Sequence, residues 1–220
     1  MTNHGRIPAR WLIAPAAVLA LNAYLVNTTH AQAPRNGVYL ASVVVSGLIS
    51  ALMMGGYALL AARLSGADPV AALALRPPTA PRRTAAQVVG GVAVIALTGI
   101  ALEPLLHGDR AQGLTPTRSP QGREWLTLAA ALIVLGLLVP LCEELLFRGL
   151  GFAAVGRYAL PVTATAFAIA HGLPALLPPV LVAGLVLGEL RRRTSSLWPG
   201  VAAHATVNLL GIVAAVLTAG

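Results

Sequence analysis

Long apolar runs constrain the fold of this chain more than any other feature of its sequence. Hydrophobic residues make up 57% of the 220 positions and charged residues only 10%, well below the quarter usual in soluble domains. Since every backbone N–H and C=O inside lipid must be bonded within the protein, apolar runs of about 20 residues form membrane-crossing helices or closed barrels. We therefore expect an all-α, polytopic integral membrane helical bundle with about seven transmembrane or partial transmembrane helices. The runs cover residues 11–28, 38–62, 86–106, 125–156, 159–171, 176–190 and 198–218.

The lengths of these runs divide the chain into two parts. Runs 159–171 and 176–190 are shorter than the roughly 20 residues that a helix needs to cross the hydrocarbon core, so they predict partial or tilted helices covered by their neighbours. The expected organisation is a set of N-terminal transmembrane anchors and loops in residues 1–120, followed by a compact core in residues 125–218.

The first run raises the question of a cleaved signal peptide. It exceeds the usual length of a signal-peptide core, and Pro34 follows the small-residue pattern at 31–33, which disfavours cleavage. A retained anchor is therefore the preferred interpretation, and a cleaved signal is the alternative.

The 15 basic residues are all arginine, and all but Arg148 lie singly or in short clusters outside the apolar runs. This distribution is typical of topology signals and does not favour nucleic-acid binding. Two of the clusters, Arg82 and Arg83 after Pro81 and the triplet at 191–193, are expected to be loops. The positive-inside rule then predicts a multi-pass protein of the cell membrane with a cytoplasmic N-terminus. The arginines expected inside are Arg6, Arg10, Arg63, Arg76, Arg82, Arg83, Arg157 and the triplet, and those expected outside are Arg35, Arg110, Arg118 and Arg123.

Glu143, Glu144 and Arg148 are three charged residues within one apolar run. A charge at membrane depth costs at least about 2.5 kcal/mol, so such residues persist mainly where they pair or carry a function. Glu144 and Arg148 have the i, i+4 spacing and the order that favour an ion pair on one helix face. We expect that pair to be structural, which leaves Glu143 for chemistry.

Two further polar pairs follow, each with four-residue spacing on one helix face: Phe167 with His171, and His204 with Asn208. Counted by helical rise from the nearest expected cytoplasmic loop, Glu143, His171 and Asn208 lie about 17 to 21 Å deep and His204 about 11 Å. These similar depths predict a shared site. Phe167 is expected to pack in the wall of its cavity.

These residues suit hydrolysis of a peptide bond inside a membrane. Glu143 is the candidate base that activates water, since an apolar site disfavours its ionised form and so favours proton transfer at neutral pH. His171 would orient that water or share its proton. His204 and Asn208 suit either stabilisation of the oxyanion or coordination of a metal.

The three motifs together resemble the CPBP family of intramembrane proteases, which includes CAAX prenyl endopeptidases and bacteriocin-processing or immunity proteins. The family patterns E-E-x-x-x-R, F-x-x-x-H and H-x-x-x-N are intact and in order, at Glu143 to Arg148, Phe167 to His171, and His204 to Asn208. The resemblance covers about residues 125–212. It implies an intramembrane endopeptidase, of a class commonly called metalloprotease, that acts on a membrane-associated peptide or protein.

Several alternatives stay open at this point. Zinc held by Glu143, His171 and His204 would use a known ligand pattern, but there is no H-E-x-x-H and Asn is a poor zinc ligand, so a metal-free site is preferred. Cys142 is the only cysteine, and a thiol in apolar surroundings is usually inert. A transporter would be expected to show paired repeat halves, which the sequence lacks. A non-catalytic membrane scaffold or immunity protein would not need all four polar residues.

Overall fold

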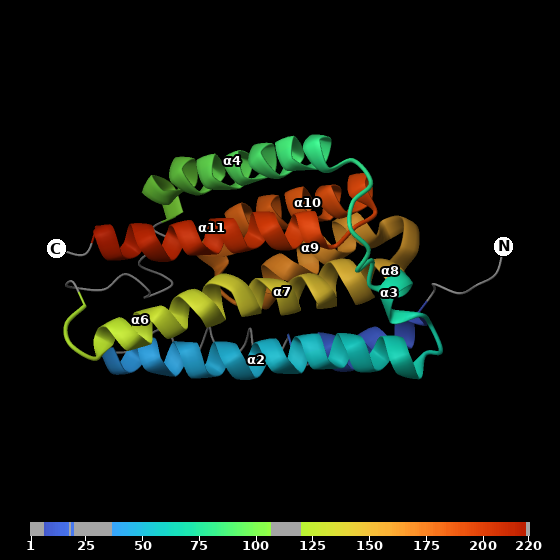
Figure 1. The fold of residues 1–220 in the computed structure, drawn as a ribbon, viewed down its shortest axis with the longest axis horizontal. Coiled ribbons are helices and arrows are strands. Elements are labelled where there is room, and N and C mark those ends of the chain that lie inside the picture. The colour runs from blue at the N-terminus through green and yellow to red at the C-terminus, as the bar shows by residue number, and fades with distance from the viewer. Residues whose placement is uncertain (1–6, 18, 20–36, 107–119, 219–220) are drawn as a thin grey trace.

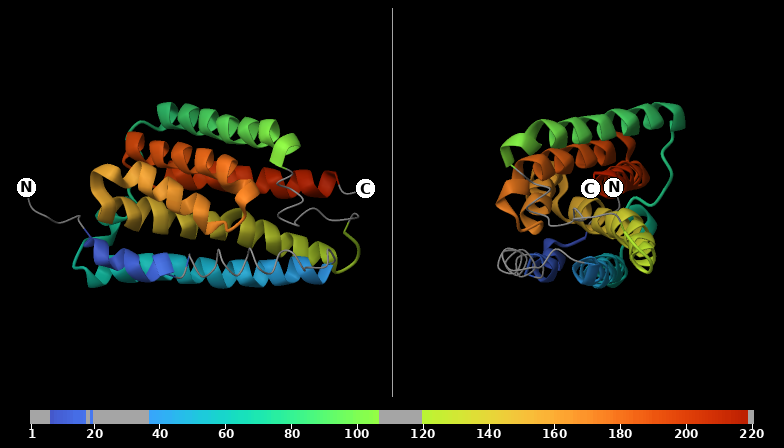
Figure 2. Two further views of the ribbon diagram at one scale, coloured as in Figure 1. Left: turned by 180° about the vertical axis from the view of Figure 1, so that it is seen from behind. Right: turned by 90° about the vertical axis from the view of Figure 1, so that its left-hand side faces the viewer.

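The computed structural model describes residues 7–17, 19, 37–106 and 120–218, and within these ranges it contains helices, turns and loops but no strand. The long helices lie roughly side by side (Figures 1 and 2). The predicted all-α membrane bundle is confirmed. Five helical stretches are long and apolar enough to cross a membrane: Ala41–Leu64, Pro81–Leu106, Glu124–Ala170, Pro174–Thr194 and Trp198–Leu217. Most of the first predicted run, the 31–33 cleavage pattern, and Arg6, Arg35, Arg110 and Arg118 lie outside the described residues.

The C-terminal half supplies the centre of the bundle. A long helical stretch begins with α6 (Glu124–Ile133), passes through a π-helical segment η3 (Val134–Leu138), α7 (Val139–Glu144) and a second π-helical segment η4 (Leu145–Gly151), and ends with α8 (Phe152–Val155). The chain then reverses through the 3-10 turn η5 (Gly156–Tyr158) into α9 (Ala159–Ala170), the short turn η6 (Pro174–Leu176), α10 (Leu177–Thr194) and α11 (Trp198–Leu217).

The reversal occurs at Gly156, whose φ of 70° lies in the left-handed region that favours glycine. Helix α9 is only 12 residues long, as expected for a partial helix. One face of α9 packs extensively against α10, and the other face, with Val162 and Ile169, is exposed.

The N-terminal helices cover two sides of this centre. Helix α2 (Gly37–Leu64) packs against α7 and both π-helical segments, while α4 (Pro81–Leu106) packs against α10 and α11. Figure 1 shows α2 and α4 on opposite sides of the bundle. The N-terminal helices therefore enclose the C-terminal half, and the division near residue 120 stays a prediction.

The segment before α4 is tied to the start of α11. It follows the single-turn helix α3 (Pro69–Ala72). The carbonyl of Ala74 accepts a hydrogen bond from the backbone N–H of Leu197 at 2.8 Å, and the carbonyl of Leu75 accepts one from Nε1 of Trp198 at 2.7 Å. These two bonds hold the first turn of the helix that carries His204.

Two predicted boundaries are wrong. Pro81, Arg82 and Arg83 were expected in a loop but form the first turn of α4, because proline is tolerated at a helix start, where its missing N–H would have no partner. The triplet at 191–193 was also expected in a loop but forms the last turn of α10. Arginines at a helix C-terminus interact favourably with the helix dipole, and Glu189 pairs with Arg192 and Arg193.

The helical extension changes the prediction for run 176–190. Together, η6 and α10 form a stretch of 21 residues from Pro174 to Thr194, long enough to cross a membrane alone. This run was expected to be too short because the arginine triplet was excluded from the helix.

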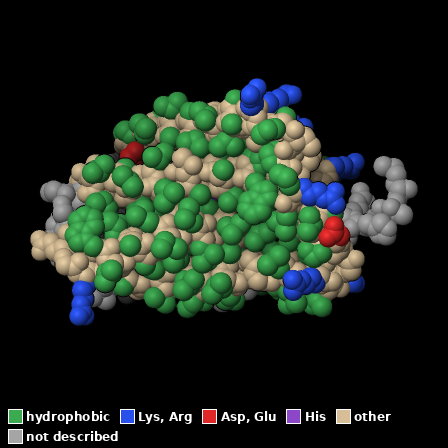
Figure 3. Space-filling model, in the orientation of Figure 1, with side chains coloured by type: hydrophobic (Ala, Val, Ile, Leu, Met, Phe, Trp, Pro, Cys, Tyr) green, Lys and Arg blue, Asp and Glu red, His purple; other side chains and the backbone are tan. Residues whose placement is uncertain are grey.

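The surface agrees with a membrane setting. In Figure 3, hydrophobic side chains cover most of the middle of the visible face and arginines lie towards its ends, mostly at one of them. The C-terminal ends of α2 and α10 and the N-terminal end of α4 meet at that same end of the bundle (Figure 1), and all three carry arginine in their terminal turns. We refer to it as the arginine-rich end. The protein is therefore a membrane protein, and the cytoplasmic position of this end stays a prediction.

Candidate active site

Glu144 and Arg148 form a buried ion pair at the centre of the candidate site. Nη1 of Arg148 donates to Oε1 of Glu144 at 2.9 Å, and the side chains are 0% and 1% exposed. Nη2 of Arg148 donates to the carbonyl of Gly184 in α10 at 3.0 Å. The pair thus connects the helix that carries both glutamates to α10.

The ring of Phe167 lies at the meeting point of the other site residues. The guanidinium carbon of Arg148 lies 4.5 Å from its centroid, in a cation–π arrangement. The rings of His171 and His204 approach it edge-on, with centroids at 4.8 and 5.5 Å. Phe167 is 2% exposed, and its ring brings residues of η4, α9 and α11 together.

His204 lies between the two glutamates. Its Nδ1 is 3.2 Å from Oε1 of Glu144, and its Nε2 is 3.6 Å from Oε2 of Glu143. Because a carboxylate only accepts, the shorter contact makes Nδ1 the donor to Glu144. The Glu143 side chain is 15% exposed and that of Glu144 is 1% exposed. Glu143 is therefore the more accessible carboxylate of the two.

His171 is oriented by the backbone of its own helix. Its Nδ1 is 2.8 Å from the carbonyl oxygen of Phe167. Because a carbonyl oxygen only accepts, Nδ1 is the donor of this bond. Helix α9 ends directly before His171, and Gly172 follows with φ of 71°. The ring therefore sits at the end of a short helix, with Nδ1 fixed by the backbone.

The side chain of Asn208 donates a hydrogen bond to a backbone carbonyl that has no N–H partner in the π-helical register. In η3 the N–H of Val139 bonds to the carbonyl of Val134, five residues earlier. In that register the carbonyl of Leu135 would pair with residue 140, which is proline and has no N–H. Nδ2 of Asn208 donates to the Leu135 carbonyl at 3.0 Å. Pro140 thus creates the acceptor that positions Asn208.

Two glycines that the sequence analysis missed make room for the ion pair. A Cβ on Gly200 would lie 2.7 Å from Oε2 of Glu144, closer than real Cβ contacts allow. A Cβ on Gly184 would lie 3.0 Å from Cα of Ala164, so α10 and α9 can approach closely there. No signal in the single sequence marks either glycine, because the steric conflict arises only when the helices are packed.

The candidate site coincides with a known family pattern. Residues 125–210 match the family model of the type II CAAX prenyl endopeptidases, Rce1-like. This segment is therefore similar to that family. The match confirms the predicted resemblance to the CPBP family over the region that contains all three motifs. It also supports a function of the CAAX-type intramembrane protease class. No curated protein matches the chain, and no solved structure does.

The side chains of the Rce1-like segment do not fit the zinc hypothesis as they stand. Among the described residues, no three His, Cys, Asp or Glu side chains gather closely enough to hold a metal ion. Both ring nitrogens of His204 face glutamate oxygens, and Nδ1 of His171 is bound to a backbone carbonyl. We therefore derive no step that passes through a metal.

Proposed function

We propose that this protein is an intramembrane endopeptidase that hydrolyses a peptide bond of a membrane-associated peptide or protein with a water activated by Glu143. The observation that carries the proposal is the difference in burial and in hydrogen-bond partners between two adjacent carboxylates. Glu144 is buried and bonded to Arg148 and His204, whereas Glu143 is partly accessible and faces Nε2 of His204. The oxygens of Glu144 are enclosed and engaged by these partners, whereas those of Glu143 can be reached by water, so Glu143 is the better general base.

The surrounding groups complete the reaction. Glu143 takes a proton from water as the water oxygen attacks the scissile carbonyl carbon, and that proton then passes to the leaving nitrogen as the C–N bond breaks. Nε2 of His171, the ring nitrogen that does not bond to the Phe167 carbonyl, orients the water. Two N–H groups stabilise the oxyanion: one on Nε2 of His204, whose Nδ1 donates to Glu144, and the second N–H on Nδ2 of Asn208, whose first N–H donates to the Leu135 carbonyl.

The 3.6 Å separation between Nε2 of His204 and Oε2 of Glu143 supports this assignment. It is longer than a direct hydrogen bond, so Oε2 of Glu143 stays available to accept a hydrogen bond from a water.

The test is Glu143→Gln in purified protein reconstituted with a library of membrane-tethered peptides. The amide keeps the shape of the side chain but cannot accept the proton, so hydrolysis should fall at least about 100-fold while expression and unfolding stay near wild type. Glu103→Gln, the same change in α4, is the matched control and should keep wild-type hydrolysis. Hydrolysis above about a tenth of wild type in Glu143→Gln would sink the assignment of the base, given the usual size of this effect.

A chelator in the same assay tests the metal-free mechanism. Turnover should be unchanged by chelation, and His204→Ala should lower it about 100- to 1,000-fold through lost oxyanion stabilisation. One equivalent of zinc that is lost together with activity and restores it on return would overturn the metal-free mechanism. Wild-type protein that cleaves no member of a broad library would instead favour a non-catalytic scaffold.

A further inference from the structure

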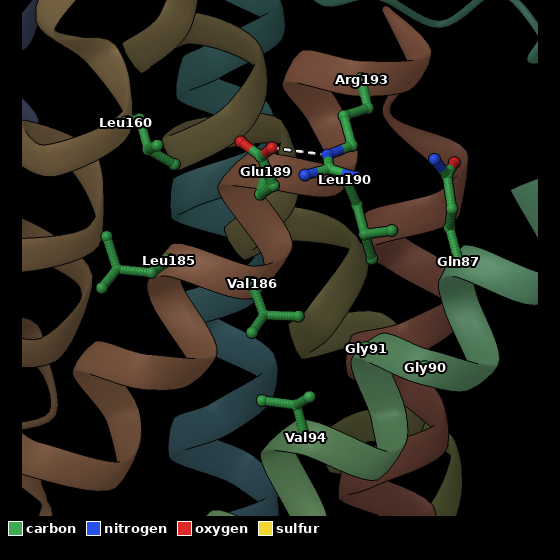
Figure 4. Close-up of a pocket in the computed structure, with 10 residues that line it drawn as sticks. All are labelled: Gln87, Gly90, Gly91, Val94, Leu160, Leu185, Val186, Glu189, Leu190 and Arg193. Atoms are coloured by element: carbon green, nitrogen blue, oxygen red, sulfur yellow. Dashed lines mark hydrogen bonds and ion pairs between the residues drawn. The ribbon is translucent and has the colours of Figure 1, made fainter.

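A groove outside the candidate site runs along the interface of two membrane-crossing helices. It has a volume of about 520 Å³ and is lined by α4 and α10, with Leu160 of α9 at its edge (Figure 4). Val94, Leu185 and Val186 make its floor and sides apolar. Val94 and Leu185 are exposed, so the groove opens on the outer surface of two helices that are candidate membrane spans, where lipid would lie.

Two adjacent glycines of α4 create this space. A Cβ on Gly91 would lie 3.1 Å from Cγ1 of Val186, so at this point the helices are in close contact. A Cβ on Gly90 would meet nothing within 4 Å, so beside it the groove is open. The groove is therefore open beside Gly90, while the two helices stay in close contact at Gly91.

One end of the groove is polar and basic. Figure 4 shows Gln87, Glu189 and Arg193 at the same end. Glu189 accepts hydrogen bonds from both Arg192 and Arg193. One carboxylate cannot neutralise two guanidinium groups, so these three side chains together carry a net positive charge. Arg83 precedes Gln87 by one helical turn on the same face of α4 and is exposed. The apolar groove thus leads to the arginine-rich end of the bundle.

We propose that this groove binds an anionic phospholipid, with an acyl chain along Gly90 and Val94 and the phosphate at Arg83 and Arg193. Basic pockets between transmembrane helices bind anionic headgroups, and arginine binds phosphate oxygens with several N–H donors. The apolar lining takes the chain, and the excess positive charge selects an anionic headgroup over a zwitterionic one. This site is separate from the proposed catalytic residues.

The experiment compares retention of phosphatidylglycerol and phosphatidylcholine with equal acyl chains, measured by native mass spectrometry of the purified protein in mild detergent. Wild-type protein should retain phosphatidylglycerol preferentially. Gly90→Leu should reduce its retention more than about tenfold, because the new side chain displaces roughly two methylene groups, each worth about fourfold. Gly99→Leu, the same change in the same helix and also in open space, is the matched control and should bind as wild type.

A second set of variants tests the headgroup. Arg83→Gln and Arg193→Gln should each lower retention of phosphatidylglycerol about fivefold and leave that of phosphatidylcholine unchanged, whereas Arg63→Gln, at the end of α2, should change neither. Equal retention of both lipids by wild-type protein would overturn the headgroup assignment. Unchanged retention of phosphatidylglycerol in Gly90→Leu, or an equal loss in Gly99→Leu, would show that the acyl chain does not bind in this groove. A free isoprenoid alcohol that binds as tightly as phosphatidylglycerol would also contradict the proposal.

Discussion

Two regions of this molecule contain a glutamate–arginine ion pair on one helix, buried in one region and exposed in the other. Glu144 with Arg148 in the candidate site and Glu189 with Arg193 at the arginine-rich end are both glutamate–arginine pairs with i, i+4 spacing. The side chains of the first pair are 1% and 0% exposed, and those of the second are 27% and 57% exposed. Helix geometry is the same in both regions, and burial is what differs.

That difference teaches what each pair can do. An exposed ion pair is screened by water and salt and contributes little to stability. A buried one has lost its hydration, so each partner depends on the other and on the bonds around them. The carbonyl of Gly184, the ring of Phe167 and Nδ1 of His204 surround the buried pair. We infer that the buried pair holds the helices of the candidate site in register, whereas the exposed pair lies at the end of a helix.

The largest effect is expected when the buried pair is broken. Arg148→Ala should lower the free energy of unfolding in mild detergent by about 3–5 kcal/mol, because it leaves the Glu144 charge buried without its partner. Glu144→Ala should also destabilise. The double variant should lose less than the sum of the two, as measured by a double-mutant cycle. Additive losses would show that the two side chains do not act as a pair.

The candidate site illustrates what a single sequence can predict. The positions of Glu143, Glu144, Arg148, His171 and His204 stand out because a polar residue in an apolar run is costly and helical spacing is regular. The contact of His204 with both glutamates could not be predicted, because Glu144 and His204 are 60 positions apart and the contact depends on how α7 and α11 pack.

Asn208 shows a different limit. Its four-residue spacing from His204 predicts the helix face, but its partner is the backbone carbonyl of Leu135. That acceptor exists because the helix before Pro140 adopts a π-helical register. The sequence contains the proline, but it does not reveal which carbonyl will be left open.

The second prediction tests how tightly α11 packs against the side chain of Glu144. Gly200→Ala should lower the free energy of unfolding by about 1–3 kcal/mol and reduce hydrolysis, because the added Cβ displaces Oε2 of Glu144. Gly211→Ala is the matched control on the same helix. A Cβ there meets nothing within 4 Å, so the change should be neutral or stabilise by up to about 1 kcal/mol. Equal stability of the two variants would mean that Glu144 can move without cost.

The fold was predictable to the extent that hydropathy determines it. Run lengths predicted the helices and the short α9, since about 20 apolar residues are needed to cross the core. Arginines and a proline are typical of loops, and for this reason the predicted start of α4 and end of α10 differ from the structure. In the structure, Pro81 begins a helix, and the arginines at 191–193 complete one in which Glu189 supplies their counter-charge. A cluster of charges beside an apolar run therefore does not by itself mark the end of a helix.

The smallest effect is expected at that exposed pair and would complete the comparison. A double-mutant cycle on Glu189 and Arg193 should give a coupling energy of about 0.3–0.5 kcal/mol, the usual value for an exposed i, i+4 pair. The measurement uses the same detergent unfolding assay, without added lipid. In about 1 M salt, where the screening length falls to about 3 Å, this coupling should vanish, whereas that of Glu144 and Arg148 should persist because salt does not reach a buried pair. Similar coupling energies at the two sites, or equal sensitivity to salt, would show that burial does not separate the two pairs, and the proposed division between a structural core pair and a helix-end pair would then fail.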